Sequence, residues 1–373
     1  MDIKKTLTFL ILAVTIVLLQ GSVHAQKPDS SAPIPLASPE ERFEARVVKI
    51  IDEREENVFG TRQRVQDIQL EALSGSMKGS VIQLTSGGIA SAAVPRYKAN
   101  DELIISHIQQ PNGQALFFIV DFVRRKALLT LFILFVIVTV SVAGRKGLAA
   151  LAGMVYSFVI IFAFVLPQIS QGHNPIAVAI IGGSLIIPVT FYISHGFNRK
   201  THIAIIGTVI SLLITGLLSE WAINFAHLTG FATEDATFVQ IMSNGAVNVK
   251  GLLLAGIIVG LFGILDDITI SQAAIVEQLR EASPNMSYAQ LYKRSMDVGR
   301  DHIGSLINTL ILVYTGAALP FMLLLTSSGD SFMTTINFEI ISEEIVRTLT
   351  ASIGLILAVP ITTFIAAKKW TRV

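Results

Sequence analysis

Long apolar runs separated by short polar segments occupy the C-terminal part of the chain. Seven such runs follow Lys126, and each is about 18 residues or longer, which is the length an α-helix needs to cross a bilayer. They predict seven transmembrane helices, at residues 127–144, 148–170, 175–194, 202–226, 251–272, 303–326 and 346–366. Residues 124–373 are therefore predicted to form an α-helical membrane domain.

Residues 41–123 carry a different pattern, in which apolar and polar positions alternate. Ile68 and Leu70, for example, alternate with Asp67 and Gln69, as in a half-buried strand. Five β-type runs can be recognised: FEARVVKIID, RVQDIQLEAL, GSVIQL, DELIISHI and QALFFIVDF. Turn-like segments separate them. Five short strands in so few residues predict a small β-rich domain, of the OB barrel type.

The first 40 residues predict export rather than a folded element. Two lysines precede an apolar run at residues 6–19, which is short for a span but typical of a signal peptide. The small residues that end at Ala25 resemble a cleavage site, so residues 1–25 are predicted to be a signal peptide, with an uncleaved anchor as the alternative. Residues 26–40 are rich in Pro and Ser and predict a linker.

Charges at the ends of the apolar runs indicate orientation. If residues 26–123 lie outside the cytoplasm, basic residues gather at the cytoplasmic ends of the runs, whereas the outer loops at 171–174, 227–249 and 327–345 contain no Lys or Arg. Exceptions are the basic triplet at 124–126 and single residues at 250 and 347. The pattern predicts an extracytoplasmic β domain and a cytoplasmic C-terminus.

Composition narrows the functional classes further. The 373 residues are 52% hydrophobic and only 15% charged, with a mean hydropathy of +0.63, whereas soluble domains carry about 25% charged residues. A net charge of +1 gives no reason to expect a nucleic-acid partner. The absence of cysteine excludes disulfides, thiolate metal sites and cysteine nucleophiles. No cofactor is expected, and the expected partners are the lipid bilayer and an ion or small molecule, with a homo-oligomer or an envelope partner also compatible.

Two adjacent carboxylates, Asp266 and Asp267, are the most unusual feature of the fifth run. At helical spacing, one face of this run carries Gly256, Gly260, Gly263, Asp267 and Ser271. Glycines at this spacing predict close packing against another helix. Asp267 is therefore expected to point into the bundle, where a carboxylate is costly unless it is paired, protonated or hydrated.

The sixth run supplies possible partners for these acids. One of its faces carries Asp297, Asp301, Ser305 and Asn308. If the fifth and sixth runs are antiparallel neighbours, the two polar faces meet, and Ser271 and Asn308 become polar ligands beside the acids. Arg300 and Asp301 are predicted to form a gate pair at the cytoplasmic mouth.

Two segments resemble a known family: GLLLAGIIVGLFGILDDITISQAAIVEQL and LYKRSMDVGRDHIGSLINTLILVYTGAALP. Together with HGFNRKTHIAIIGT, they are similar to the YibE/F family of bacterial multi-pass membrane proteins. The resemblance covers most of residues 120–367 and implies a fold and a bacterial inner-membrane location rather than an activity. The family's motif positions correspond here to Gly263, Asp266, Asp267, Ser271 and Gln272, and then to Gly299, Arg300, Asp301, Gly304, Asn308 and Thr309.

Three functional hypotheses follow. In the first, which we favour, the chain is an ion-coupled permease with Asp267 as the primary proton or cation site, Asp266 as its coupled neighbour, and Ser271, Gln272 and Asn308 as polar ligands of an unspecified ion. In the second, an envelope sensor or scaffold uses the β domain and the acids are purely structural. The third, a membrane-embedded enzyme, is disfavoured because the GxGD, GxSxG and HExxH patterns are absent.

Overall fold

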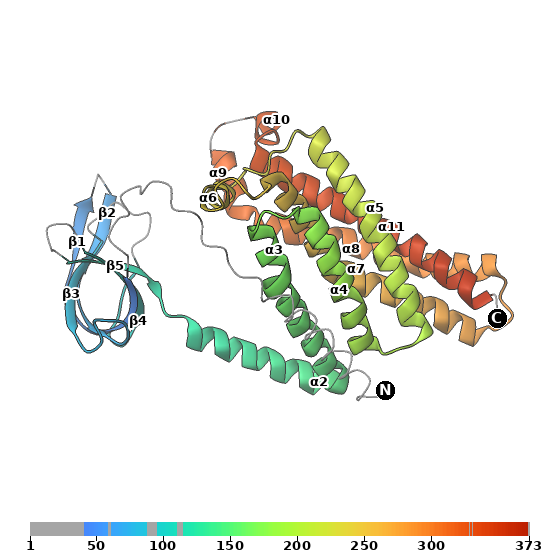
Figure 1. The fold of residues 1–373 in the computed structure, drawn as a ribbon, viewed down its shortest axis with the longest axis horizontal. Helices are drawn as coiled ribbons and strands as arrows, with labels where there is room; N and C mark the ends of the chain where they lie inside the picture. Colours follow the sequence, from blue (N-terminus) through green and yellow to red (C-terminus); the bar gives the residue numbers. More distant parts are fainter. Residues whose placement is uncertain are drawn as a thin grey trace. The chain divides into compact units, whose positions relative to one another are not determined.

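The structure, a computed structural model, describes residues 41–58, 61–87, 95–109, 115–327, 329 and 331–371. It contains two compact units, and the boundary between them lies between Val138 and Thr139 (Figure 1). The predicted signal peptide at 1–25 and the predicted linker at 26–40 lie outside the described residues.

The first unit is built on a five-stranded antiparallel sheet that curls into a half-barrel (Figure 1). Its strands are β1 (Glu41–Val58), β2 (Thr61–Ala72), β3 (Val81–Ser86), β4 (Glu102–Gln109) and β5 (Ala115–Phe122), in the order β3-β2-β1-β4-β5. The long strand β1 pairs with both β2 and β4, and two register shifts in its pairing with β2 allow it to bend. The five predicted strands are confirmed.

Strict alternation puts the apolar side chains of the sheet on one face. Phe43, Ala45 and Val47 of β1 are buried, while Glu44 and Arg46 between them remain partly exposed. The core is completed by Ile68, Leu70, Ala72, Ile82, Tyr97, Leu103 and Ile105. The period-two pattern therefore accounts for both the strands and their buried face.

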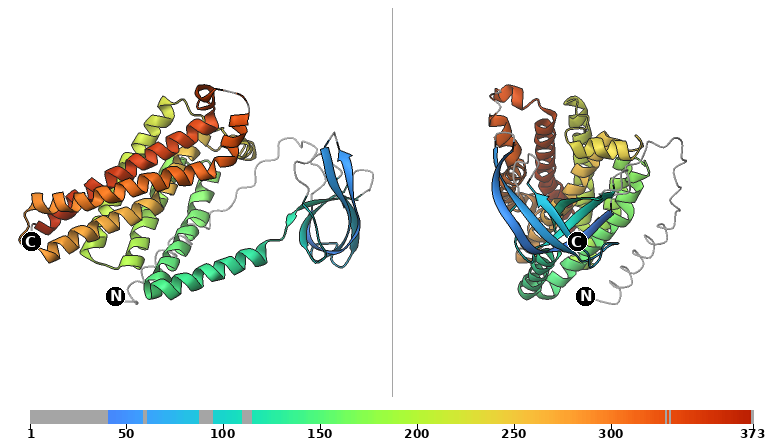
Figure 2. Two further views of the ribbon diagram at one scale, coloured as in Figure 1. Left: turned by 180° about the vertical axis from the view of Figure 1, so that it is seen from behind. Right: turned by 90° about the vertical axis from the view of Figure 1, so that its left-hand side faces the viewer.

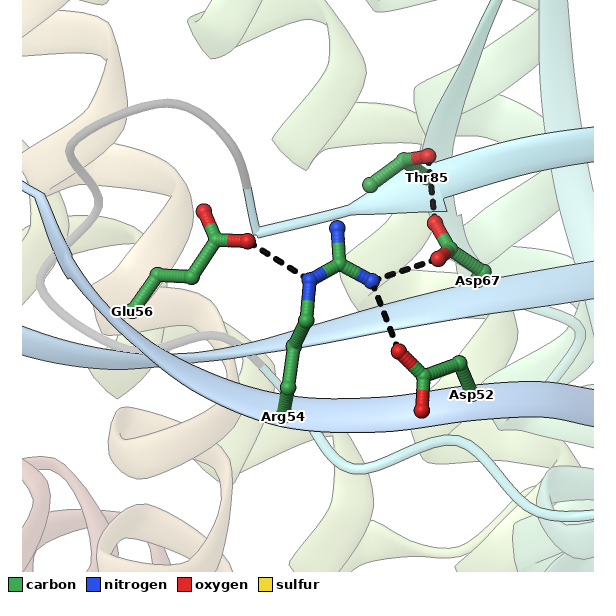
Figure 3. A network of polar contacts seen from close by, with 5 residues as sticks. All are labelled: Asp52, Arg54, Glu56, Asp67 and Thr85. Carbon is green, nitrogen blue, oxygen red and sulfur yellow. Dashed lines mark hydrogen bonds and ion pairs between the residues drawn. The ribbon is translucent and has the colours of Figure 1, made fainter.

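A polar network joins the first three strands (Figure 3). Arg54 of β1 donates from Nη1 to Asp67 Oδ2 of β2 at 2.5 Å and from Nε to Glu56 Oε1 at 2.6 Å. Thr85 of β3 donates to Asp67 Oδ1 at 2.6 Å. The hydrogen bonds from Thr85 and Arg54 hold the pKa of Asp67 below its usual value. Because the charged side chains are partly exposed, we expect the network to align the strands more than to stabilise them.

Two of the predicted transmembrane runs form one bent helical segment. Helix α2 (Arg125–Ile160) continues through the π-helical turn η1 (Ile161–Val165) into α3 (Leu166–Ser170). The segment bends at Gly144, where φ is 56° and ψ is −132°, a conformation that glycine adopts easily because it has no Cβ. The runs predicted at 127–144 and 148–170 are thus the two arms of a single candidate span.

Four further helices are long and apolar enough to cross a membrane. They are α4 (Pro175–His195), α5 (Arg199–Phe225), α7 (Val249–Ala282) and α11 (Glu339–Thr371), and they match the runs predicted at 175–194, 202–226, 251–272 and 346–366. The side chains of Asn174, Asn198 and Asn248 accept hydrogen bonds from the first turns of α4, α5 and α7 and so define where these helices begin. The short helix α6 (Glu234–Met242) separates α5 from α7.

The run predicted at 303–326 is not a single helix. It is divided between α8 (Tyr288–Ala317) and α9 (Leu319–Ser327), and the short α10 (Phe332–Thr335) follows. Pro320 explains the break, because proline has no N–H to bond back into α8 and its ring crowds the preceding turn. Neither piece qualifies as a candidate span, so the described residues contain five such spans and the prediction of seven is not confirmed.

A tight seam between α5 and α11 holds the helical unit together, and these helices run side by side with α7 and α8 (Figures 1 and 2). A methyl group at Gly354 of α11 would lie 2.9 Å from Thr215 Cβ of α5. A methyl group at Gly207 of α5 would lie 3.2 Å from Thr362 Cβ of α11. The two pairs follow opposite chain directions, so the helices are antiparallel, and the glycines allow their backbones to approach closely.

Candidate functional site

The two adjacent acids of α7 differ in their surroundings. Asp266 is partly buried, and its Oδ1 atom is buried without a hydrogen-bond partner among the described residues. Asp267 is exposed, because consecutive residues of a helix point about 100° apart. The carboxylate that the bundle encloses is therefore Asp266, and the prediction that Asp267 points into the bundle is wrong.

The glycine face of α7 does not pack against another described helix. Gly256, Gly260 and Gly263 are exposed, and a methyl group at any of them would meet no described atom within 4 Å. Their predicted packing role is thus wrong for this chain. Helix α7 turns its larger side chains inward instead, and Phe262 lies so close to Gly183 of α4 that a methyl group there would overlap the ring, with 2.6 Å to Cε1. Large apolar side chains remove more surface from solvent than glycines do, so they occupy the buried face.

Buried hydroxyl groups link α7 to α5 beside Asp266. Thr269 Oγ1 and Thr208 Oγ1 lie 2.7 Å apart, and both residues are fully buried. Thr269 Oγ1 is also 3.3 Å from the carbonyl oxygen of Asp266. Residues three apart share a helix face, so the enclosed carboxylate and the hydroxyl pair face the same side of α7.

Thr208 belongs to a row of buried hydroxyl groups along α5, which continues with Ser211, Thr215 and Ser219. The row is about 17 Å long at the usual helical rise. The Oγ atoms of Ser211 and Ser219, and Thr362 Oγ1 of α11, have no hydrogen-bond partner among the described residues. Buried hydroxyl groups normally bond to protein or to ordered water, so this row offers polar contacts within the bundle.

Gln272 is the predicted site residue that the structure brings together with neighbouring helices. Its side chain is buried, and Nε2 donates to the Ser295 carbonyl oxygen of α8 at 3.0 Å and to Thr363 Oγ1 of α11 at 2.7 Å. Both N–H groups of the Gln272 amide therefore donate to neighbouring helices, so Gln272 links α7 to α8 and α11. We assign it a structural role.

The predicted residues on α8 lie apart from the acids. Asp301 and Asn308 are exposed, Ser271 is partly buried, and no hydrogen bond among the described residues joins Asn308 to Ser271. Arg300 donates from Nη1 to Asp297 Oδ1 at 2.8 Å, which corrects the predicted Arg300–Asp301 pair. Residues three apart share a helix face, whereas adjacent residues point in different directions. This spacing explains why Arg300 pairs with Asp297 rather than with Asp301.

Charged groups at the ends of α4 and α5 lie within electrostatic reach of Asp267, which is in the middle of α7. His195, at the end of α4, interacts electrostatically with Lys200, Asp267 and Lys146. Lys200 of α5 also pairs with Glu277 of α7, with 3.1 Å between Nζ and Oε2. Within the described ranges, no group of three or more His, Asp or Glu side chains is arranged to hold a metal ion. His195, Lys200 and Glu277 thus form a charged mouth, and Asp267, next to the enclosed Asp266, interacts with this mouth through His195.

Small residues at every fourth position of α5 and α11 indicate close helix packing, and the sequence analysis did not identify them. On α5 these positions are Gly207, Ser211, Thr215 and Ser219, and on α11 they are Thr350, Gly354, Ala358, Thr362 and Ala366. All of them are buried. Repeated small residues at this spacing mark close helix pairs in membranes. The same signal on α7 pointed to a face that is exposed.

Comparison with known proteins adds one finding to this geometry. The family described as YibE/F-like protein matches residues 131–372, which include Asp266, Asp267 and both helices of the seam. No curated protein and no solved structure matches the chain. The matched residues do not include the five-stranded sheet.

Proposed function

Since the chain belongs to the YibE/F-like family and its apolar helices are compatible with a multi-pass membrane protein, we propose that it is a proton-coupled permease that uses Asp266 to bind the coupling proton. The observation that carries the proposal is the buried, unpartnered Oδ1 atom of Asp266 in a helix long enough to cross a bilayer. A bare charge at such a position is expensive. A proton neutralises it with a single bond, whereas cations such as Ca²⁺ need six to eight oxygen ligands.

In this mechanism Asp267 exchanges protons with water at the charged mouth and passes them to Asp266. The Thr208–Thr269 hydroxyl pair faces the same side of α7 as Asp266. The unpartnered hydroxyl groups of Ser211 and Ser219 continue the row along α5. Asp, Glu and His chains serve as proton relays in membrane proteins, and in this proposal the hydroxyl row together with ordered water extends such a relay from Asp266. No covalent reaction of a substrate is involved, so the protein acts as a transporter rather than an enzyme.

Proton flux through the purified protein tests this proposal. The full chain is reconstituted in liposomes that contain a pH-sensitive dye, and an imposed membrane potential drives protons inward. Without a co-transported substrate the assay measures the proton leak of the protein: we expect a leak above that of protein-free liposomes, loss of this leak in Asp266→Asn, and a slower leak in Asp267→Asn. Asp297→Asn is the matched control, because Asp297 is an exposed acid whose partner Arg300 lies on the same helix. Wild-type flux in Asp266→Asn would contradict the proposal.

The predicted orientation forms part of the same proposal. We place residues 26–123 outside the bacterial inner membrane and the C-terminus in the cytoplasm, which puts the charged mouth at His195 and Lys200 on the cytoplasmic side. The two arms of α2 and the divided run at 303–326 would then supply the spans that a seven-pass topology needs. Cysteine accessibility at positions 198 and 235, introduced one at a time into this cysteine-free chain, tests the orientation.

An envelope sensor or scaffold is the second candidate, and a specific observation favours it. The sheet is tied to the start of α2 by three ion pairs: Arg124–Asp121 at 2.5 Å, Arg125–Glu44 at 2.5 Å and Lys126–Glu102 at 2.9 Å. Such pairs would transmit a change in the sheet to the first helix. The strand order, with β1 paired to both β2 and β4, also supports an OB-type barrel, a fold that often binds ligands.

Complementation of a deletion strain separates the two candidates. Under the permease hypothesis, Asp266→Asn fails to restore the wild-type phenotype and the double variant Glu44→Gln/Glu102→Gln succeeds. Under the sensor hypothesis, the double variant fails and Asp266→Asn succeeds.

A further inference from the structure

A cavity of about 600 Å³ lies between α8, α9, α10 and α11, away from the acidic pair. Its walls are mainly apolar and include Ile311, Met322, Phe332 and Leu349. Cavities of about 300–1,000 Å³ with mostly apolar walls and a few polar groups are typical of sites for drug-sized ligands. The size and lining of this cavity are therefore those of a small-molecule site.

The polar side chains that line the cavity carry a net negative charge. Glu344 is the one charged residue among the described residues that line it, and the hydroxyl-bearing Tyr314 and Thr315 line it from α8. Arg347 Nε lies 3.5 Å from Glu344 Oε2, but this nitrogen forms no hydrogen bond to the described residues. The carboxylate of Glu344 consequently keeps its capacity to accept hydrogen bonds from another cation.

The surroundings of Glu344 add to the negative charge. Glu339 and Glu343 lie in the same first turns of α11, so this end of the helix carries three acids against the single positive charge of Arg347. The aromatic rings of Tyr314 and Phe332 in the wall can also attract a cation through their faces. Apolar walls and a negative polar end together complement a molecule with an apolar body and a positive head.

We propose that this cavity binds an amphiphilic cation, that is, a small molecule with a large apolar body and one positive charge that contacts Glu344. The site is distinct from the one that binds the coupling proton in the proposed function, because no residue of α7 lines the cavity. A lipid acyl chain or a neutral apolar molecule would fit the walls but would leave the carboxylate with only the 3.5 Å ion pair to Arg347.

Binding of tetraphenylphosphonium to the full chain in lipid nanodiscs tests the proposal, with empty nanodiscs as the background. Tetraphenylborate, which has a similar shape and the opposite charge, is the matched probe. We expect saturable binding of the cation, weaker by about tenfold or more in Glu344→Gln because a hydrogen-bonded charge is lost. Leu349→Trp, which fills the cavity, should weaken it comparably. Glu234→Gln, an exposed acid of α6, should bind as the wild type does.

Three results would overturn the inference. They are the absence of saturable cation binding, equal binding by the borate anion, and wild-type cation binding by both Glu344→Gln and Leu349→Trp. Thermal unfolding of each variant verifies that it is folded. Asp266→Asn should leave cation binding unchanged, so a failure of this inference and a failure of the proton-coupling proposal give different results.

Discussion

Substituting alanine for Gly354 should destabilise the helical unit, whereas the same change at Gly256 should not. A methyl group at Gly354 would lie 2.8 Å from Thr215 Cγ2 and 2.9 Å from Thr215 Cβ. Rotation about χ1 cannot move Cβ, so the backbones of α5 and α11 would have to separate. Overpacking of this kind costs about 1–3 kcal/mol. If Gly354→Ala lowers the free energy of unfolding by about 2 kcal/mol, the midpoint of thermal unfolding should fall by roughly 4–8 °C in a domain of this size.

Gly256 offers the matched control. A methyl group there meets no described atom within 4 Å, and alanine favours a helix by about 1 kcal/mol relative to glycine. Gly256→Ala should therefore leave the midpoint unchanged or raise it slightly. The fluorescence of Trp221 in α5 and Trp370 in α11, the two tryptophans of the chain, monitors unfolding in detergent.

A double variant tests the assigned contact directly. Thr215→Ala removes two of the three closest atoms, so in the Gly354→Ala background it should recover part of the lost stability, in a non-additive manner. The reasoning would be refuted if Gly354→Ala unfolded at the wild-type temperature, or if Gly256→Ala lowered the midpoint as much as Gly354→Ala does.

Three further predictions concern single residues. Gln272→Ala should cost about 1–3 kcal/mol, because the Ser295 carbonyl oxygen and Thr363 lose their buried donor; thermal unfolding measures the loss, and Gln278→Ala, at an exposed position of the same helix, should not change stability. Arg300→Gln should change stability by less than about 0.5 kcal/mol, because its ion pair with Asp297 is exposed; a larger fall in the same assay would contradict this estimate. Asp67 has its pKa lowered by Thr85 and Arg54 in the folded sheet, so its contribution is present above its unfolded pKa of about 3.9 and is lost as the pH falls through the lower folded value. Pepsin should therefore cleave within residues 41–122 faster in Asp67→Asn than in the wild type at pH 4.5, with a smaller difference at pH 3; equal rates at both pH values would argue against a role for this carboxylate.

The strands and most spans could be predicted because each depends on local periodicity. Alternation of period two placed β1 through β5, and apolar length placed α4, α5, α7 and α11. The run at 303–326 could not be predicted correctly from length alone. Pro320 divides it, and a proline within a membrane run is compatible with either a kink or a break.

The candidate site was predicted less well, since residue type and spacing do not specify which face of a helix is covered. Spacing grouped Gly256, Gly260, Gly263 and Asp267 on one face of α7, and the structure leaves that face exposed. Spacing also paired Arg300 with Asp301, although the geometry of a helix favours a partner three residues away.

The amino-acid sequence by itself determined which segments form helices and strands, which residues cap the helices, and that two acids lie within an apolar helix. These properties arise from interactions between residues close along the chain. The tertiary structure alone decided that Asp266 is enclosed and Asp267 is exposed, that α5 and α11 pack through small residues, and that a cavity opens beside Glu344. Each of these depends on which helix covers which face, and that choice is made by the fit of side chains from segments far apart in the sequence.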